Sequence, residues 1–114
     1  MHDIVWPESE KRVARRVFDA ALKHELGEIM AEFKARADRA KTPEEMWSVA
    51  EYLAQKRHAI DQKYDYRYSR LLDVFGVLLS EKRIEERELV GLGDAKLAIV
   101  RRTAGFLYEA RSAR

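Results

Sequence analysis

The sequence predicts an all-α fold made of a few long helices, and three observations carry this prediction. Only two prolines and five glycines interrupt the 114 residues. Apolar residues recur at three- to five-residue steps over most of the chain, the spacing that places them on one face of a helix. Both prolines stand where helices are expected to begin, because the first helical turn tolerates proline. Strands have little room in such a chain.

The first helix is predicted over residues 9–39, after the pair Trp6-Pro7. Its apolar positions follow helical spacing: Val13, Val17, Ala21, Leu26, Met30, Phe33 and Ala37. A second helix is predicted to begin at the run Thr42-Pro43-Glu44-Glu45. The hydroxyl of Thr42 is expected at the N-cap, Pro43 at the first helical position, and Glu45 as the reciprocal capping partner.

The second helix is predicted to carry one apolar stripe, formed by Met46, Ala50, Leu53, Ile60 and Tyr64. The helical spacing of apolar residues continues from Tyr68 to Leu79, and the sequence does not show whether the helix bends near Asp65. Residues 80–88 form a charged segment in which Ile84 is the only apolar residue. Gly91 and Gly93 are expected to flank a turn before Asp94 caps a last helix. That helix is expected to bury Leu97, Val100, Ala104 and Leu107.

Composition restricts the class of protein. The 22 basic and 20 acidic residues leave a net charge of only +2, which attracts nucleic acid or anionic lipid weakly. The chain has no cysteine, and its longest apolar stretch, residues 74–79, is too short to span a bilayer. We therefore expect one domain over residues 1–114, located in the cytoplasm, with no membrane insertion and no nucleic acid as partner.

Helix length predicts an elongated, helical homodimer. A helix of about 30 residues is roughly 45 Å long, whereas a compact domain of this size has a radius of gyration of about 13 Å. Apolar stripes on such helices need a cover, and a two-fold partner of the same sequence is the commonest one.

The chain lacks the patterns expected of an enzyme, so we predict no catalytic residue, no metal and no cofactor. His58, Asp61 and Asp65 lie one helical turn apart and are the best candidate for a metal site, but a solvated or hydrogen-bonded polar face explains the same spacing. A second rival is nucleic-acid binding through the basic tail from Lys96 to Arg114. Cations near the C-terminus of a helix also account for that tail.

Two side chains on the second helix admit more than one interpretation. Arg57 falls on the apolar stripe, so it must extend its charge to water, pair with Asp61, or meet an acid on a partner. Trp47 lies about 110° from that stripe, on the side of Glu51, His58 and Asp61. It is either a flanking core residue or an interface anchor, since tryptophan and arginine often dominate interfaces.

Residues 52–69, read as YLAQKRHAIDQKYDYRYS, resemble the fluorescence recovery protein family of cyanobacteria. The resemblance is strongest in Trp47, Leu53, Lys56-Arg57-His58, Ile60-Asp61, Lys63-Tyr64-Asp65 and Arg67. It extends more weakly to Val74-Phe75, Leu78-Leu79 and residues 89–96. Helical periodicity alone does not determine the polar identities in this run.

The resemblance implies a non-enzymatic, all-helical homodimer that binds the C-terminal domain of the photoactivated orange carotenoid protein. Binding accelerates return to the resting state and ends phycobilisome quenching. The residues expected at the partner-binding surface are Trp47, Glu51, Arg57, His58 and Asp61, and those expected at the dimer interface are Met46, Leu53, Ile60 and Tyr64.

This chain differs from the family pattern at Ala50, Glu51 and Ala59, where histidine, aspartate and glutamate are expected. The alternative is a homologous adaptor that acts on a different protein in a bacterium without phycobilisomes.

Overall fold

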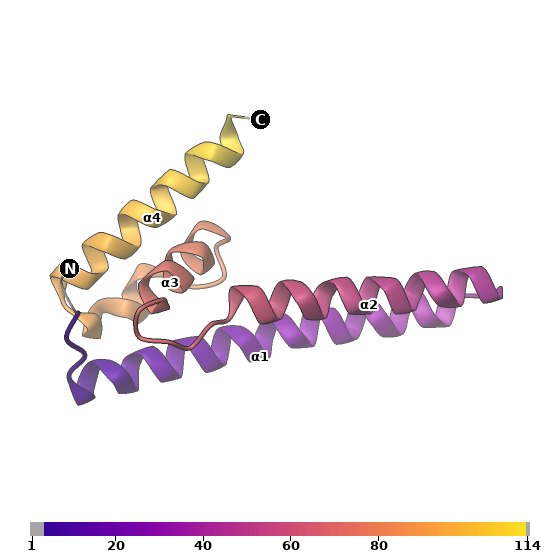
Figure 1. Ribbon diagram of the computed structural model, residues 1–114, viewed down its shortest axis with the longest axis horizontal. Coiled ribbons are helices and arrows are strands. Elements are labelled where there is room, and N and C mark those ends of the chain that lie inside the picture. The colour runs from indigo at the N-terminus through magenta and orange to yellow at the C-terminus, as the bar shows by residue number, and fades with distance from the viewer. Residues whose placement is uncertain (1–3, 114) are drawn as a thin grey trace. The chain divides into compact units, whose positions relative to one another are not determined.

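A computed structural model describes residues 4–113, which form five helices and no strand. The order is α1 (Glu8–Arg39), α2 (Pro43–Lys63), α3 (Leu71–Ser80), the 3₁₀ helix η1 (Glu86–Leu92) and α4 (Asp94–Ser112) (Figure 1). The prediction of an all-α fold is confirmed. No helix in the described part combines the length and the apolar character that crossing a membrane requires.

The chain divides into two compact units. We call residues 22–64 the hairpin unit, and residues 1–21 together with 65–114 the core unit. Helix α1 contributes its first part to the core unit and the remainder to the hairpin unit. The expectation of a single domain stays a prediction.

The start of α2 forms as predicted. The Thr42 hydroxyl oxygen accepts a hydrogen bond of 3.2 Å from the backbone N–H of Glu45, and Pro43 is the first helical residue. The Glu45 carboxylate accepts in turn from the Thr42 hydroxyl at 3.2 Å and from the backbone N–H of Lys41 at 3.4 Å. The Thr42 hydroxyl thus satisfies the exposed backbone amide of the first turn, and the Glu45 carboxylate in turn holds that hydroxyl in place.

Helix α2 ends at Lys63, which settles the question that the sequence left open around Asp65. Tyr64 leaves the helical conformation, with φ −98° and ψ 76°, and α3 begins only at Leu71. Aromatic contacts hold the connecting segment within the core unit. Tyr66 meets Phe18 edge to face at 4.8 Å between ring centroids, and Tyr68 lies 5.5 Å from Trp6.

The core unit contains the largest fully buried apolar side chains, which are Leu71, Phe75, Leu78, Leu89, Leu92 and Val100. Helices α3 and α4 approach closely at Gly76, where an added Cβ would lie 2.5 Å from the Cγ2 of Thr103. On α4, Leu97, Val100 and Ala104 are buried as predicted, whereas Leu107 is only partly covered.

The segment before α4 differs from the prediction. Instead of a turn flanked by two glycines, residues 86–92 form η1, which starts with a capping box between Glu85 and Glu88. Gly93, with φ 88°, is the N-cap residue of α4, so Asp94 is the first helical residue rather than its cap. The reason is apolar burial, because the 3₁₀ turns direct Leu89 and Leu92 into the core.

Candidate protein-binding surface

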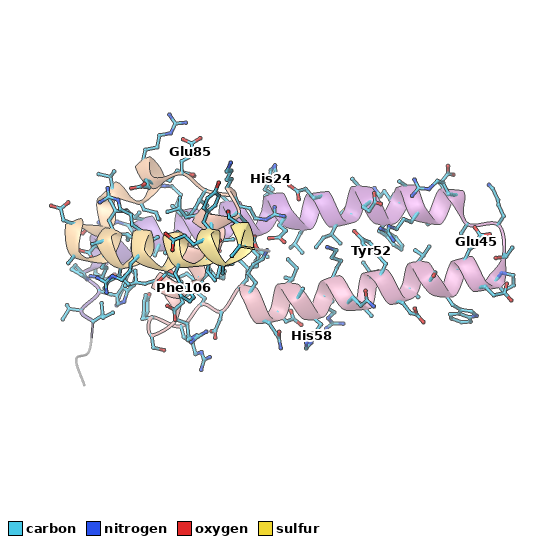
Figure 2. All side chains as sticks on the ribbon, turned by 90° about the horizontal axis from the view of Figure 1, so that it is seen from above. His24, Glu45, Tyr52, His58, Glu85 and Phe106 are labelled. Carbon is cyan, nitrogen blue, oxygen red and sulfur yellow. The ribbon has the colours of Figure 1, made fainter. Side chains whose placement is uncertain are left out.

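Helix α2 packs against α1 through a narrow inner face. Val49 and Ile60 are buried there, and Tyr52 lies between the two helices, where its ring meets the guanidinium of Arg36 at 4.1 Å from the centroid (Figure 2). The two helices are antiparallel, since Tyr52 meets Arg36 near one end while Lys63 meets Glu25 toward the other.

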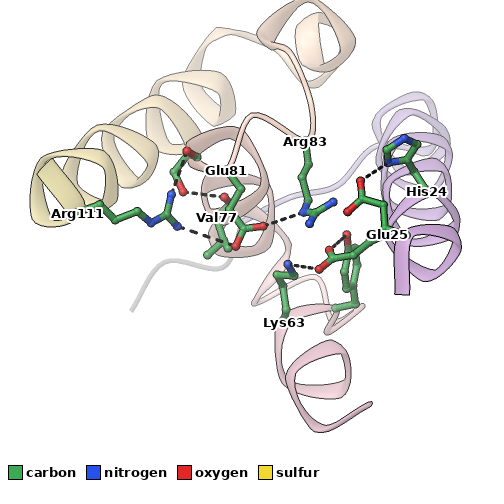
Figure 3. Close-up of polar contacts among 10 residues, drawn as sticks. His24, Glu25, Lys63, Val77, Glu81, Arg83 and Arg111 are labelled. Carbon is green, nitrogen blue, oxygen red and sulfur yellow. Dashed lines mark hydrogen bonds and ion pairs between the residues drawn. The ribbon is translucent and has the colours of Figure 1, made fainter. Parts of the chain in front are cut away.

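A buried carboxylate closes the other end of this face. Glu25 on α1 accepts a hydrogen bond of 2.7 Å from the Lys63 ammonium and another of 2.7 Å from the Tyr64 hydroxyl (Figure 3). The charge pair is largely shielded from water, which strengthens each bond and makes an unmatched charge costly. Sequence reasoning missed Glu25; its signal was a carboxylate at an inner-face position of the long first helix.

The opposite side of α2 carries a solvent-facing stripe, formed by Trp47, Glu51, His58 and Asp61. At about 100° per residue these four positions share one face, roughly opposite Val49 and Lys63. Trp47 is 63% exposed, which excludes the interpretation as a flanking core residue within the chain. Figure 2 shows His58 on the outer side of α2.

Arg57 lies at the edge of this stripe and is open to solvent. Its side chain is 86% exposed, and its Nε lies 4.0 Å from the Asp61 carboxylate, which is also exposed. An exposed pair at that separation contributes little, because water screens it and both side chains must be ordered. The guanidinium therefore keeps its donors available to an acidic group on another molecule.

The predicted single apolar stripe of α2 is divided between two faces. Met46 and Leu53 are exposed, whereas Ile60 is buried against the hairpin and the Tyr64 hydroxyl is bound to Glu25. The assignment of these four residues to a dimer interface stays a prediction, and Ile60 and Tyr64 make their described contacts within the chain.

Helix α1 carries a matching exposed set that includes Leu26 and Met30. Leu26 and Met30 on α1, and Met46 and Leu53 on α2, project about a quarter turn away from the inner face of their own helix. Viewed along the chain direction, this rotation has the same sense on both helices. Because the helices are antiparallel, equal rotations place both sets on the same side of the hairpin. This side, defined by Leu26, Met30, Met46 and Leu53, is called the apolar side below.

The rival metal site finds no support in the described residues. No group of three histidine, aspartate or glutamate side chains in residues 4–113 is placed to hold a metal ion. Asp65 is engaged by Arg67, whose Nε donates to its carboxylate at 2.9 Å and 3.0 Å. These hydrogen bonds and the neighbouring positive charges hold the pKa of Asp65 below its usual value.

The basic tail is largely occupied by contacts within the core unit. Lys96 pairs with Glu10 at 2.6 Å, and Arg101 pairs with Glu86. Arg111 donates to the backbone carbonyl of Ser80 at 3.0 Å (Figure 3). These cations stabilise the fold, which weighs against the second rival, nucleic-acid binding.

Comparisons with known proteins point to one family. Residues 6–104 match the family described as photoprotection regulator fluorescence recovery protein. The fluorescence recovery protein of Synechocystis sp. (strain PCC 6803) is 32% identical over 99 residues, which cover 87% of this chain and 91% of that protein.

Solved structures agree with this match. The fluorescence recovery proteins of Fremyella diplosiphon and Synechocystis sp. PCC 6803 each superpose with a TM-score of 0.83 at 32% identity. Each superposition covers 88% of this chain and 98% of the other.

Proposed function

The chain belongs to the fluorescence recovery protein family, and on that premise we propose that it is a non-enzymatic, homodimeric regulator that ends photoprotection. In this proposal it acts in the cytoplasm and binds the C-terminal domain of the photoactivated orange carotenoid protein. Binding accelerates return to the resting state, so that phycobilisome quenching stops.

The observation that carries the proposal is the exposed stripe of α2. An indole that is 63% exposed shares one face with charged side chains, and the guanidinium of Arg57, at the edge of that face, has only a weak partner. Tryptophan and arginine supply large contact areas and directional donors, and for this reason they recur among the residues that dominate protein interfaces. No described contact within the chain requires either side chain to be there.

Such a surface regulates by binding one conformation of its partner more tightly than the other, without catalysing a chemical step. A binder shifts a conformational equilibrium only as far as its affinities for the two conformations differ. To accelerate the reversion, it must also stabilise the barrier state more than the bound starting state. In the proposed mechanism, Trp47 and Arg57 make contacts with the carotenoid protein that become stronger as that protein returns to its resting state.

The test mixes the purified protein with photoactivated orange carotenoid protein and records recovery of the resting absorbance in darkness. Trp47→Leu and Arg57→Leu are expected to weaken binding about 30-fold each, as for interface residues worth about 2 kcal/mol. Circular dichroism should remain unchanged, since both side chains are exposed. Arg12→Leu on α1 is the matched control, because Arg12 is exposed in the core unit and lies off the stripe.

The result separates the proposal from its alternative. Recovery that neither the protein nor its variants accelerate would favour an adaptor acting on another partner. Acceleration that survives both substitutions would remove Trp47 and Arg57 from the mechanism.

The proposed homodimer rests on the apolar side of the hairpin. Leu26, Met30, Met46 and Leu53 expose large apolar surfaces on one side of two antiparallel helices, which is unfavourable in water unless a partner covers them. Light scattering is expected to show a dimer at tens of micromolar, and Leu53→Glu to shift it toward monomer. A monomeric native protein at these concentrations would refute the dimer.

A further inference from the structure

The two methionines within the described residues lie on the same side of the hairpin unit. The sequence has no cysteine and three methionines, and the two within the described residues are Met30 on α1 and Met46 on α2. They are 55% and 52% exposed, and both belong to the apolar side. Met30 and Met46 are thus accessible to solvent in a single chain and lie within the surface that the proposed dimer covers.

An exposed thioether reacts with hydroperoxides. A sulfur lone pair attacks one peroxide oxygen, the O–O bond breaks, and the sulfur gains that oxygen as a sulfoxide. The second oxygen leaves as water or an alcohol after taking up a proton. The sulfur loses two electrons and the peroxide accepts them, so no other reactant is needed.

The product suits a dimer interface poorly. A sulfoxide replaces a flexible apolar side chain with a polar, chiral one. Its oxygen must keep a hydrogen-bond partner when it leaves water, and the apolar side chains that share this side, Leu26 and Leu53, have none to offer. Oxidation therefore disfavours the covered state and leaves the single chain unaffected, because both sulfurs are already exposed there.

We propose that Met30 and Met46 form a reversible oxidation site, at which a hydroperoxide converts the thioethers to sulfoxides and dissociates the dimer. This inference rests on the proposed dimer. Because the dimer covers both sulfurs, oxidation proceeds through the free subunit, and high protein concentration protects them. Methionine sulfoxide reductases remove the oxygen and restore assembly.

The experiment treats the purified full-length protein with hydrogen peroxide and follows oxygen uptake by peptide mass spectrometry, at about 16 Da per oxygen. Sedimentation then measures the dimer dissociation constant, which is expected to rise about tenfold or more on oxidation. Oxidation of both sulfurs is expected to slow as protein concentration rises, relative to free methionine added as an internal competitor. Subsequent reduction by the reductases is expected to return the original constant.

The double variant Met30→Leu, Met46→Leu is the control, since leucine preserves apolar volume and has no oxidisable sulfur. It is expected to dimerise and to keep its dissociation constant in peroxide. Dissociation of this variant by peroxide would overturn the assignment, and so would an unchanged constant in native protein that carries both oxygens. A native protein that is monomeric before treatment would instead refute the proposed dimer itself.

Discussion

The core unit and the hairpin unit differ in how many large apolar side chains they bury. The core unit buries many large apolar side chains, with Phe75 of α3 and Leu89 of the 3₁₀ helix fully buried, although Val90, Phe106 and Tyr108 stay exposed. In the hairpin unit only Val49 and Ile60 among the apolar side chains of the described residues are buried, and leucine and methionine side chains stay exposed.

The difference shows which part of the molecule is complete as a single chain. Apolar burial is the main favourable contribution to folding, and the core unit obtains it internally. The hairpin is held by its capped turn, by the buried Val49 and Ile60, by the ring of Tyr52 against Arg36, and by the hydrogen bonds of Lys63 and Tyr64 to Glu25. A hairpin that buries few apolar side chains and exposes several large ones is suited to association with another protein.

The largest expected effect tests this contrast directly. Phe75→Ala removes a fully buried ring from the core unit and should lower the free energy of unfolding by about 3–5 kcal/mol. The loss should be independent of protein concentration, because the cavity forms within the chain. Leu53→Ala in the hairpin should cost little at low concentration and more at high concentration, where the dimer contributes. Urea unfolding at two concentrations measures both, and a concentration-dependent loss in Phe75→Ala would contradict the contrast.

A smaller effect is expected from the buried carboxylate of the hairpin. Glu25→Gln removes the carboxylate charge that the shielded Lys63 ammonium contacts, and should cost about 2 kcal/mol. Glu28→Gln, one turn along α1, removes an exposed carboxylate beside His24 and should cost about 0.5 kcal/mol or less. Thermal unfolding compares the two variants. Equal losses would show that the hairpin does not depend on its internal charge pair.

The smallest effect concerns the backbone after α3. Lys82 has φ 61°, in the left-handed region where a Cβ is unfavourable. Lys82→Gly should therefore stabilise the protein by about 0.5–1 kcal/mol, despite the greater freedom of glycine in the unfolded chain. Lys34→Gly, within α1 at a helical position, should destabilise by about 1 kcal/mol. Chemical denaturation of the two variants should give shifts of opposite sign, and a loss in Lys82→Gly would contradict the strain.

Local chemistry made much of the fold predictable from the sequence. The cap at Thr42 and the proline after it act within one helical turn, so the start of α2 could be read directly. The end of α2 could not, because apolar spacing continues past Asp65. The chain leaves the helix there, and Tyr66 and Tyr68 pack against Phe18 and Trp6, which are distant in the sequence.

The candidate site was predictable in its residue types but not in its exposure. Spacing placed Trp47, Glu51, His58 and Asp61 on one side of a helix, and left open whether that side meets solvent. The structure decides the question because α1 packs on the face of Val49 and Ile60, which turns the indole outward. It also divides the predicted apolar stripe, since Ile60 lies nearer that inner face than Met46 does.

The sequence by itself determined the helical class, the start of the second helix and the set of side chains able to form a binding surface. These follow from interactions between residues a few positions apart. The tertiary structure alone decided which side of α2 is covered, how Glu25 is paired, and that Leu26, Met30, Met46 and Leu53 remain exposed. These depend on which helix packs against which face, and periodicity in one helix contains no information about its neighbour.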